Sequence, residues 1–380
     1  MSAEFEVRLA TRADEPDIRA LVGSVAMPGD VAIRFEREPD YFLGATIMGD
    51  PCDVVVGRRR DDGVLVGLAC RAEQNAYVAD EPTRVGYIGQ IRIAEGARGR
   101  GLVGRGARLL RERTPPGMLG FGVVARENRR ATGALVGARL PAGLRAARVA
   151  GLTTCAIVLR GRAARRAPGP AHGGVASRPA HGGVDVRSAD ATTLTDALAF
   201  WHANGPRRQF FPVTTEASFA DGATLRGLRP EDVFLAWCGD RIVGTMALWE
   251  QSAYKQDVVH AYGSVLRRLR PAYDLAARLL GARPLTPPGE PIALAFAARV
   301  CVADDDPSVM RALLRAVAAD AHARGLAFLM VGLADDDPLL SVVRRHPHIT
   351  YRSDLYALSW TDDPLARLDG RVPYVEIATL

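Results

Sequence analysis

The chain has 380 residues, of which 48% are hydrophobic and 24% charged, and its formal net charge is +6. This composition is typical of a globular protein, and the length suggests two domains of ordinary size. No apolar run approaches the roughly 18 residues that a membrane span needs, and the acidic, mixed N-terminus differs from a signal peptide. We therefore expect a soluble, cytoplasmic protein without a membrane partner.

The positive charge is concentrated in one part of the chain. Residues 84–166 carry 18 Arg and three acidic residues, a net charge of +15, so the rest of the chain carries −9. A nucleic-acid surface, a pocket for a phosphorylated small molecule and a generally arginine-rich composition with one lysine, Lys255, all fit this distribution. Few aromatic residues lie among these arginines, so we favour the phosphorylated cofactor and predict no nucleic-acid partner.

The cysteines and histidines predict neither disulfides nor a metal site. The five cysteines are scattered, odd in number and without a CxxC spacing. We expect all five to be buried thiols: Cys52, Cys70, Cys155, Cys238 and Cys301. His172 and His181 lie in two copies of PAHGGV, which lack the carboxylate or cysteine partner that a metal site needs.

Taken in chain order, the first elements alternate between strand and helix. Residues 5–9 alternate as a strand, and apolar residues at helical spacing over 18–25 predict a helix. A short second helix is expected at 41–43. A hairpin follows over 53–73 and turns at residues 61–63, which read Asp-Asp-Gly.

Residues 87–113, YIGQIRIAEGARGRGLVGRGARLLRER, join a strand over 85–93 to a helix through a loop rich in Arg and Gly. Glycines permit close backbone approach, and N–H groups at a helix N-terminus bind anions. The loop therefore predicts a site for a phosphate or pyrophosphate. Another strand is expected at 118–124, a helix at 127–136 and a strand at 152–159.

The second half repeats the order of the first. Residues 161–183 are rich in Gly, Pro, Ala and Arg and predict a flexible linker between domains at 1–160 and 184–380. The repeated elements are a strand at 185–187, a helix at 194–201, a hairpin at 232–250, a strand at 292–302, a helix at 308–323 and strands at 327–333 and 355–360.

An insertion at about 252–289 has no counterpart in the first half. It contains apolar residues at helical spacing, which suggest helix packing or a cover over a pocket. These residues are Val265, Leu269, Leu275 and Leu279.

The order of elements and the Arg/Gly loop resemble the GNAT superfamily of acyl-CoA-dependent N-acyltransferases, twice over. The resemblance implies an α/β (α+β) fold of two tandem domains, each a mixed, mostly antiparallel twisted sheet flanked by helices. It also implies an enzyme that transfers an acyl group, most simply acetyl from acetyl-CoA, to a primary amine of a small molecule or peptide. Longer-chain acyl transfer to a peptide and a non-catalytic acyl-CoA-binding scaffold are the alternatives, and a homodimer is a candidate assembly.

In that superfamily a Gln/Arg-x-x-Gly-x-Gly/Ala loop binds the cofactor pyrophosphate through backbone N–H groups. The pattern maps to Arg98, Gly99, Arg100, Gly101, Leu102 and Val103, followed by Gly104. Val103 departs from the usual Gly or Ala but keeps its backbone N–H. The superfamily also splays the preceding strand so that its backbone pairs with pantetheine, and an asparagine opening the next helix contacts the same arm. The resemblance places these roles at Ile91, Arg92, Ile93 and Asn128.

The same glycines are also compatible with a second kind of cofactor, a dinucleotide. Gly99, Gly101 and Gly104 satisfy the GxGxxG pattern of a Rossmann NAD(P) site. This alternative fits less well, because a hairpin precedes the motif and residues 94–98 separate the strand from the glycines.

In the second half, residues 304–307 read Asp-Asp-Asp-Pro where the first half has its loop. Three carboxylates repel a pyrophosphate, and proline removes one N–H donor. We therefore expect a single cofactor site and a degenerate second half that completes the substrate cleft. The acidic clusters at 304–306 and 335–337 predict either helix caps or steering of a cationic acceptor.

Acyl transfer to an amine needs a base or water relay, donors for the developing oxyanion and an acid for the leaving thiolate. The candidate catalytic residues are Glu73, Gln90 (as a polar orienter), Tyr87 and Glu127. The superfamily often takes the acid from a tyrosine on the helix after the asparagine, but residues 88–253 contain none. In some related acyltransferases a C-terminal carboxylate is the base, which makes the apolar tail 371–380 a further candidate.

Overall fold

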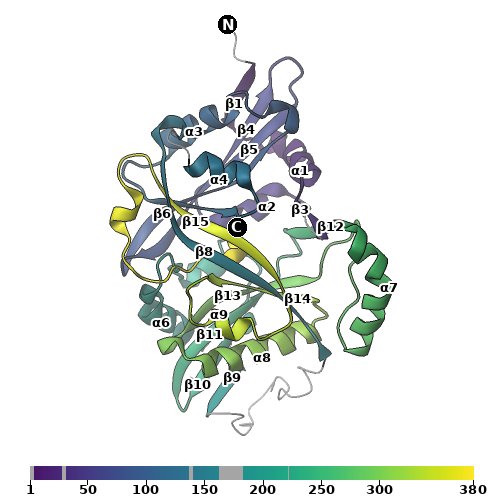
Figure 1. Ribbon diagram of the computed structural model, residues 1–380. Helices are drawn as coiled ribbons and strands as arrows, with labels where there is room; N and C mark the ends of the chain where they lie inside the picture. The colour runs from purple at the N-terminus through teal and green to yellow at the C-terminus, as the bar shows by residue number, and fades with distance from the viewer. Residues whose placement is uncertain (1–3, 28–30, 137–139, 162–182, 221) are drawn as a thin grey trace.

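Strands from both halves of the chain join in one twelve-stranded sheet in the computed structural model, which describes residues 4–27, 31–136, 140–161, 183–220 and 222–380 (Figure 1). The first half contributes β1 (Phe5–Leu9), β4 (Cys52–Arg59), β5 (Leu65–Val78), β6 (Glu81–Ile93), β7 (Gly120–Ala125) and β8 (Arg145–Val158). The second half contributes β9 (Val184–Ser188), β10 (Val233–Cys238), β11 (Arg241–Trp249), β13 (Leu294–Val302), β14 (Phe328–Ala334) and β15 (His348–Ser359). The order across the sheet is β1-β4-β5-β6-β7-β15-β8-β14-β13-β11-β10-β9.

The two halves exchange their last strands at the centre of this sheet. β15 of the second half lies between β7 and β8, and β8 of the first half lies between β15 and β14. All three of these pairings are antiparallel. The β8–β15 register runs from Ile157 opposite His348 to Arg145 opposite Ser359. Each half therefore receives a strand from the other, which the sequence repeat did not predict.

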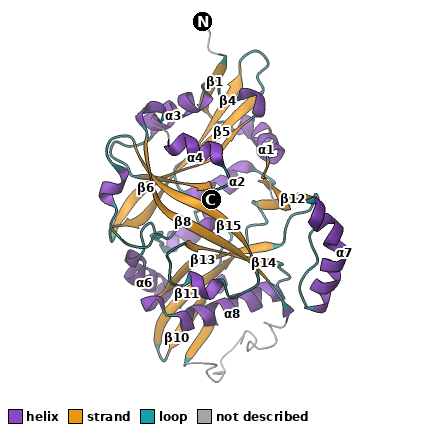
Figure 2. Cartoon of the chain, viewed as in Figure 1, coloured by secondary structure: helices purple, strands orange, loops and turns teal. Residues whose placement is uncertain are grey.

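Helices lie along the sheet in both halves (Figure 2). The helices are α1 (Glu15–Ser24), α2 (Tyr41–Ala45), α3 (Leu102–Arg113), α4 (Arg129–Val136), α6 (Leu194–Asn204), α7 (Ser264–Leu279), α8 (Pro307–Ala323) and α9 (Leu340–Val343). A Cβ on Gly57 of β4 would lie 2.7 Å from Leu102 of α3, and one on Gly244 of β11 would lie 2.7 Å from Val309 of α8. The same close helix-to-sheet contact thus occurs in both halves.

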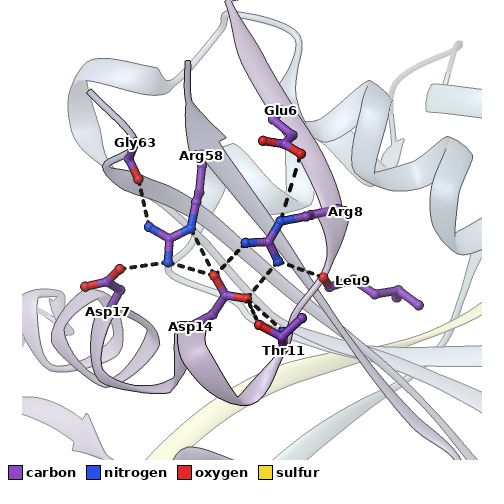
Figure 3. Close-up of polar contacts among 8 residues, drawn as sticks. All are labelled: Glu6, Arg8, Leu9, Thr11, Asp14, Asp17, Arg58 and Gly63. Carbon is purple, nitrogen blue, oxygen red and sulfur yellow. Dashed lines mark hydrogen bonds and ion pairs between the residues drawn. The ribbon is translucent and has the colours of Figure 1, made fainter. Parts of the chain in front are cut away.

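A buried carboxylate fixes the N-terminal edge of the sheet (Figure 3). Asp14, which precedes α1, accepts hydrogen bonds from Arg8 of β1 and Arg58 of β4, and from the backbone N–H and hydroxyl of Thr11. The bond from Arg8, with those from Thr11 and Arg58, holds the pKa of Asp14 far below its usual range. The carboxylate stays ionised and ties the first helix to two strands.

A smaller sheet joins the halves a second time. β3 (Val31–Glu36) pairs antiparallel with β12 (Gln256–Tyr262) and with β2 (Ala26–Met27). β12 belongs to the insertion at 252–289, so the insertion supplies a strand as well as α7. No described helix is long and apolar enough to cross a membrane.

Two expectations about side chains are wrong. Cys238 is exposed and Cys52 only half-buried, so the five cysteines are not all buried thiols. The apolar residues of α7 face solvent instead of packing on a neighbour or covering a pocket. Their exposed fractions are 70% for Val265, 56% for Leu269, 61% for Leu275 and 79% for Leu279.

The sheet also argues against the dinucleotide alternative. Among its described strand pairs only β6–β7 and β13–β14 are parallel, whereas a Rossmann sheet is mostly parallel. The helical and strand segments predicted from the repeat are present in both halves. Residues 162–182, which make up most of the predicted linker and include His172 and His181, lie outside the described residues.

The strand exchange predicts that neither half folds alone. We propose that 1–160 and 184–380 are units of the repeat and not independent folding units. Residues 1–161 produced alone lack β15, which leaves one edge of β7 and both edges of β8 unpaired. We expect this fragment to aggregate, and to form a one-to-one complex when produced together with residues 183–380. Size-exclusion chromatography and thermal unfolding measure both outcomes, and a cooperative unfolding transition of either fragment alone would contradict the prediction.

Candidate functional site

The first half of the sheet opens between β6 and β7. These parallel strands pair at Gly86–Gly120 and Tyr87–Phe121 and diverge beyond Tyr87. A β-bulge lies just after this point, where the register of β6 against β5 shifts and Gln90 has a φ of +54°. A bulge leaves a residue outside the ladder and changes the direction of its side chain. The opening therefore presents the edge of β6 to a ligand lying between the two strands.

The Arg/Gly loop continues from the open end of β6. A 3-10 turn at Glu95–Ala97 leads to Gly99, with a φ of +75°, and to Gly101, with a φ of +85°. Gly101 is the N-cap of α3, and glycine adopts such left-handed conformations without strain. The first N–H groups of α3 have no partner within the helix, and together with the helix dipole they form an anion site.

Some side chains of the loop are buried and anchor it to the sheet, and others are exposed to solvent. Leu102 is buried against the sheet, while Val103 is 50% exposed beside Gly104. Arg98 lies 4.0 Å from Glu95, and Arg100 pairs with Glu4 at 2.5 Å. Both guanidinium groups are about half exposed, so they are accessible to a phosphate at the helix N-terminus.

The residues expected to meet the pantetheine arm lie along the same opening. Ile91 is 52% exposed. The Arg92 guanidinium lies over the ring of Phe35, and Ile93 packs at the edge of the small core beneath the loop. Asn128 follows β7, and its Oδ1 accepts a hydrogen bond from the Ala131 N–H at 3.1 Å. This cap uses the amide oxygen of Asn128, so the amide nitrogen is the group suited to a ligand.

The tail of the chain ends in a pocket of the first half, near the label C of Figure 1. Arg37, α2 and the turn after α2 form one wall of the pocket, Gln90 of the bulge another, and Thr379 and Leu380 the third. Lys255 of the second half donates hydrogen bonds from Nζ to the backbone oxygens of Ala378, at 2.8 Å, and Leu380, at 2.9 Å.

The second half repeats the opening but fills it with the tail. β13 and β14 pair in parallel only from Leu294 to Phe296, and β13 has its own bulge, where Arg299 has a φ of +52°. Glu376 accepts hydrogen bonds from the backbone N–H and from Nη1 of Arg299, both at 2.9 Å. A Cβ on Gly332 of β14 would lie 2.4 Å from Ile377. The tail thus occupies the position that a ligand has available in the first half.

Buried charges surround the end of the tail. The exposed fraction of Arg37 is 5% and that of Lys255 is 8%. Burial, reinforced by the charge of Arg37, lowers the pKa of Lys255 to about 7, although Asp257 and Glu376 act in the opposite direction. Burial also raises the pKa of Asp257, whose Oδ1 has no hydrogen-bond partner. Lys255, which holds the end of the tail, is therefore a group whose charge changes near neutral pH.

The four candidate catalytic residues have very different surroundings. Glu73 forms ion pairs with Arg71 and Arg84, and although burial acts to raise it, these bonds hold the pKa of Glu73 below its usual range. Glu127 is exposed at the end of β7. Tyr87 is buried against Phe121, and burial raises its pKa.

Of these four residues, Gln90 is the one that lines the pocket. Two guanidinium groups engage the carboxylate of Glu73, which makes this residue a poor base. We propose a structural role for Glu73. The sequence reasoning missed Arg37 and Lys255. Arg37 is one of many arginines and does not stand out in the sequence. Lys255 is the single lysine of the chain, and this rarity was the signal that could have drawn attention to it.

The acidic clusters of the second half are engaged within the protein. Asp306 accepts a hydrogen bond from the Ser308 N–H at 2.7 Å and caps α8, which confirms the capping prediction there. Asp304 and Asp305 pair with Arg207 and Arg208. In the part of the chain that the structure describes, no three His, Cys, Asp or Glu residues are grouped to hold a metal ion.

Solved structures share this architecture. Saccharomyces cerevisiae N-myristoyltransferase with bound myristoyl-CoA superposes with a TM-score of 0.59 at 11% identity, covering 99% of this chain and 90% of that one. A GCN5-related N-acetyltransferase from Sphaerobacter thermophilus gives 0.53 at 15% identity and covers both chains completely. The glucosamine N-acetyltransferase region of a fungal multi-domain β-N-acetylglucosaminidase gives 0.55 at 14% identity, covering 94% of this chain and 38% of that one.

No family model and no curated protein sequence matches the chain. At these identities the likeness concerns the fold. The chain shares the fold of these N-myristoyltransferase and GCN5-related N-acetyltransferase structures, which confirms the predicted fold class and, as far as the fold is concerned, the resemblance.

The lowered pKa of Lys255 predicts how stability depends on pH. The folded protein binds this proton only below about pH 7, whereas an unfolded lysine binds it up to about pH 10.5. Between these values the unfolded state binds more protons, so the free energy of unfolding rises with pH, by about 1.4 kcal/mol for each unit of pKa difference. Urea unfolding across this range measures the rise.

Lys255→Met keeps the length of the side chain and removes the proton. The free energy of unfolding of the native protein is expected to rise with pH relative to that of this variant, which has no proton to lose at position 255. A difference that stays constant across the range would contradict the assignment of a neutral Lys255.

Proposed function

We propose that the chain is an acyl-CoA-dependent N-acyltransferase that transfers an acyl group, most simply acetyl from acetyl-CoA, to a primary amine of a small molecule or peptide. One observation carries the proposal. The opening between β6 and β7 leads from a β-bulge at Gln90 to a glycine loop at the N-terminus of α3, and the matching opening of the second half is filled by residues 374–377. A single long ligand with a pyrophosphate at one end fits this arrangement.

The helix N-terminus and the resemblance to the GNAT superfamily together suggest the roles along the opening. We propose that the N–H groups of Leu102, Val103 and Gly104 would bind the pyrophosphate, with charge supplied by Arg98 and Arg100. As the resemblance implies, the backbone of residues 91–93 and the amide nitrogen of Asn128 would hold the pantetheine arm. When bound, the cofactor would supply the thioester.

The reaction joins the amine nitrogen to the thioester carbon and breaks the carbon–sulfur bond. The amine gives up one proton, and the thiolate takes one from solvent, because α4 carries no tyrosine. The backbone N–H groups around the bulge are the available donors for the oxyanion. We propose that Gln90, which lines the pocket at the bulge, orients the amine or a water relay that takes its proton.

We propose a short acyl group over a long one. The buried residues Tyr41, Ile47 and Met48 line the same pocket as Gln90. The alternative of longer-chain transfer draws on the N-myristoyltransferase structures, whose titles name bound myristoyl-CoA. Comparing acetyl-CoA with myristoyl-CoA as acyl donors, with thiol release measured across a panel of amines and peptides, distinguishes the two and also a non-catalytic scaffold.

The loop arginines predict the strength of cofactor binding. Replacing Arg98 and Arg100 together by Glu puts two negative charges beside the pyrophosphate, and we expect acetyl-CoA affinity to fall by on the order of 100-fold or more. Isothermal titration calorimetry measures the affinity, and an unchanged melting temperature shows that the fold is intact.

A control variant with the same change of charge, Arg311→Glu with Arg345→Glu, alters exposed arginines of the second half and is expected to bind normally. Retained affinity in the loop variant would mean that the pyrophosphate lies elsewhere. Binding of NAD(P)H in place of acetyl-CoA would contradict the proposed function itself.

A further inference from the structure

The helix α7 carries an apolar stripe that faces away from the protein. Eleven large hydrophobic side chains are exposed among the described residues, and five of them lie within 265–280. Residues 265, 269, 272, 276 and 279 are spaced by four and three, so they lie on one face of the helix. Their side chains are Val, Leu, Ala, Ala and Leu. A contiguous stripe of this kind on one helix is the pattern of a docking surface.

The orientation of α7 is fixed by contacts on its opposite face. Arg270 lies over the ring of Tyr262 and donates to the carbonyl oxygen of Leu285, and Asp274 accepts from the Leu285 N–H at 2.8 Å. Ala277 is buried on the same side. These contacts leave the apolar stripe exposed to solvent. The helix itself lies at the edge of the molecule, beyond β12 (Figure 1).

The charge beside the stripe is positive. Arg267, Arg268 and Arg278 are exposed on the flanks of the helix, and Arg283 is exposed on the segment that follows it. Asp274, the acidic residue of α7, is already bonded to Leu285 and pairs with Arg270 at 3.5 Å. A second copy of this helix packed on the stripe would bring like charges together, whereas an anionic surface would complement them.

From this arrangement we propose that α7 docks on the surface of a membrane rich in anionic lipid. The stripe lies in the interface with Val265, Leu269 and Leu279 among the acyl chains, and the arginines meet the headgroup phosphates. The helix lies on the bilayer and does not span it. The absence of a spanning segment, on which the expectation of no membrane partner rested, does not bear on this kind of contact.

The proposal is independent of catalysis, because α7 is not part of the β6–β7 opening or of the pocket at the tail. Co-sedimentation of the full chain with vesicles of phosphatidylcholine plus phosphatidylserine, compared with phosphatidylcholine alone, measures the binding. We expect binding to the anionic vesicles that weakens as salt is raised. Binding to neither composition, or equally to both, would overturn the proposal.

Leu269→Glu with Leu279→Glu is expected to lower the affinity for anionic vesicles by about tenfold or more. Val64→Glu with Leu365→Glu introduces the same charges at exposed apolar positions elsewhere and is expected to bind normally. Equal loss in both double variants would overturn the assignment to α7. Melting temperature and acetyl-CoA affinity report on the fold of each variant.

Arg267→Gln with Arg268→Gln keeps the apolar stripe and tests the charge separately. We expect affinity for anionic vesicles to fall by about fivefold for each arginine removed. Analytical ultracentrifugation tests whether a second copy of the chain, instead of a membrane, covers the stripe. A dimer of the native chain that Leu269→Glu with Leu279→Glu converts to a monomer would identify the partner as a second copy and overturn the lipid proposal.

Discussion

The pairing of β8 with β15 is the contact on which the rest of the structure depends. These strands come from different halves, yet they lie side by side along most of their length and join two smaller sheets into one. Because β15 crosses into the first half, the chain that follows it returns through the opening between β13 and β14 and ends beside Gln90. A tandem repeat without this exchange would have no reason to place its C-terminal tail in the pocket of its first half.

Both halves keep the same strained bulge but use it differently. Gln90 and Arg299 share a left-handed backbone that is costly for residues other than glycine. In the second half the buried ion pair between Arg299 and Glu376 compensates part of this cost, and breaking such a pair by removing one partner typically costs about 3–5 kcal/mol. Among the described residues of the first half, no carboxylate bonds to Gln90 in this way, so its backbone strain is not offset by such a pair. In the duplicated fold, the opening between β13 and β14 is therefore filled by the tail, and the opening between β6 and β7 remains free for a ligand.

Local patterns in the sequence predicted the elements and the glycine loop, because these depend on neighbouring residues. The hairpin turn at 61–63 and the glycine loop that leads into α3 are examples. The strand exchange was not predictable in this way, since periodicity identifies a strand without naming its partner. The same limit applies to α7, where the spacing identified an apolar face but not its direction, and to Lys255, whose shifted pKa arises from residues distant in sequence.

The excess of arginine at 84–166 shows that the net charge of a sequence segment differs from the charge that remains accessible once the chain has folded and formed ion pairs. Arg113 pairs with Asp53, and Arg126 and Arg148 both pair with Asp354, so acids from the negative remainder of the chain neutralise part of the positive segment. Arg98 lacks a close partner of this kind, because its ion pair with Glu95 is 4.0 Å long and exposed. The half-exposed guanidinium groups of Arg98 and Arg100 therefore add positive charge at the N-terminus of α3, where backbone geometry already favours a phosphate.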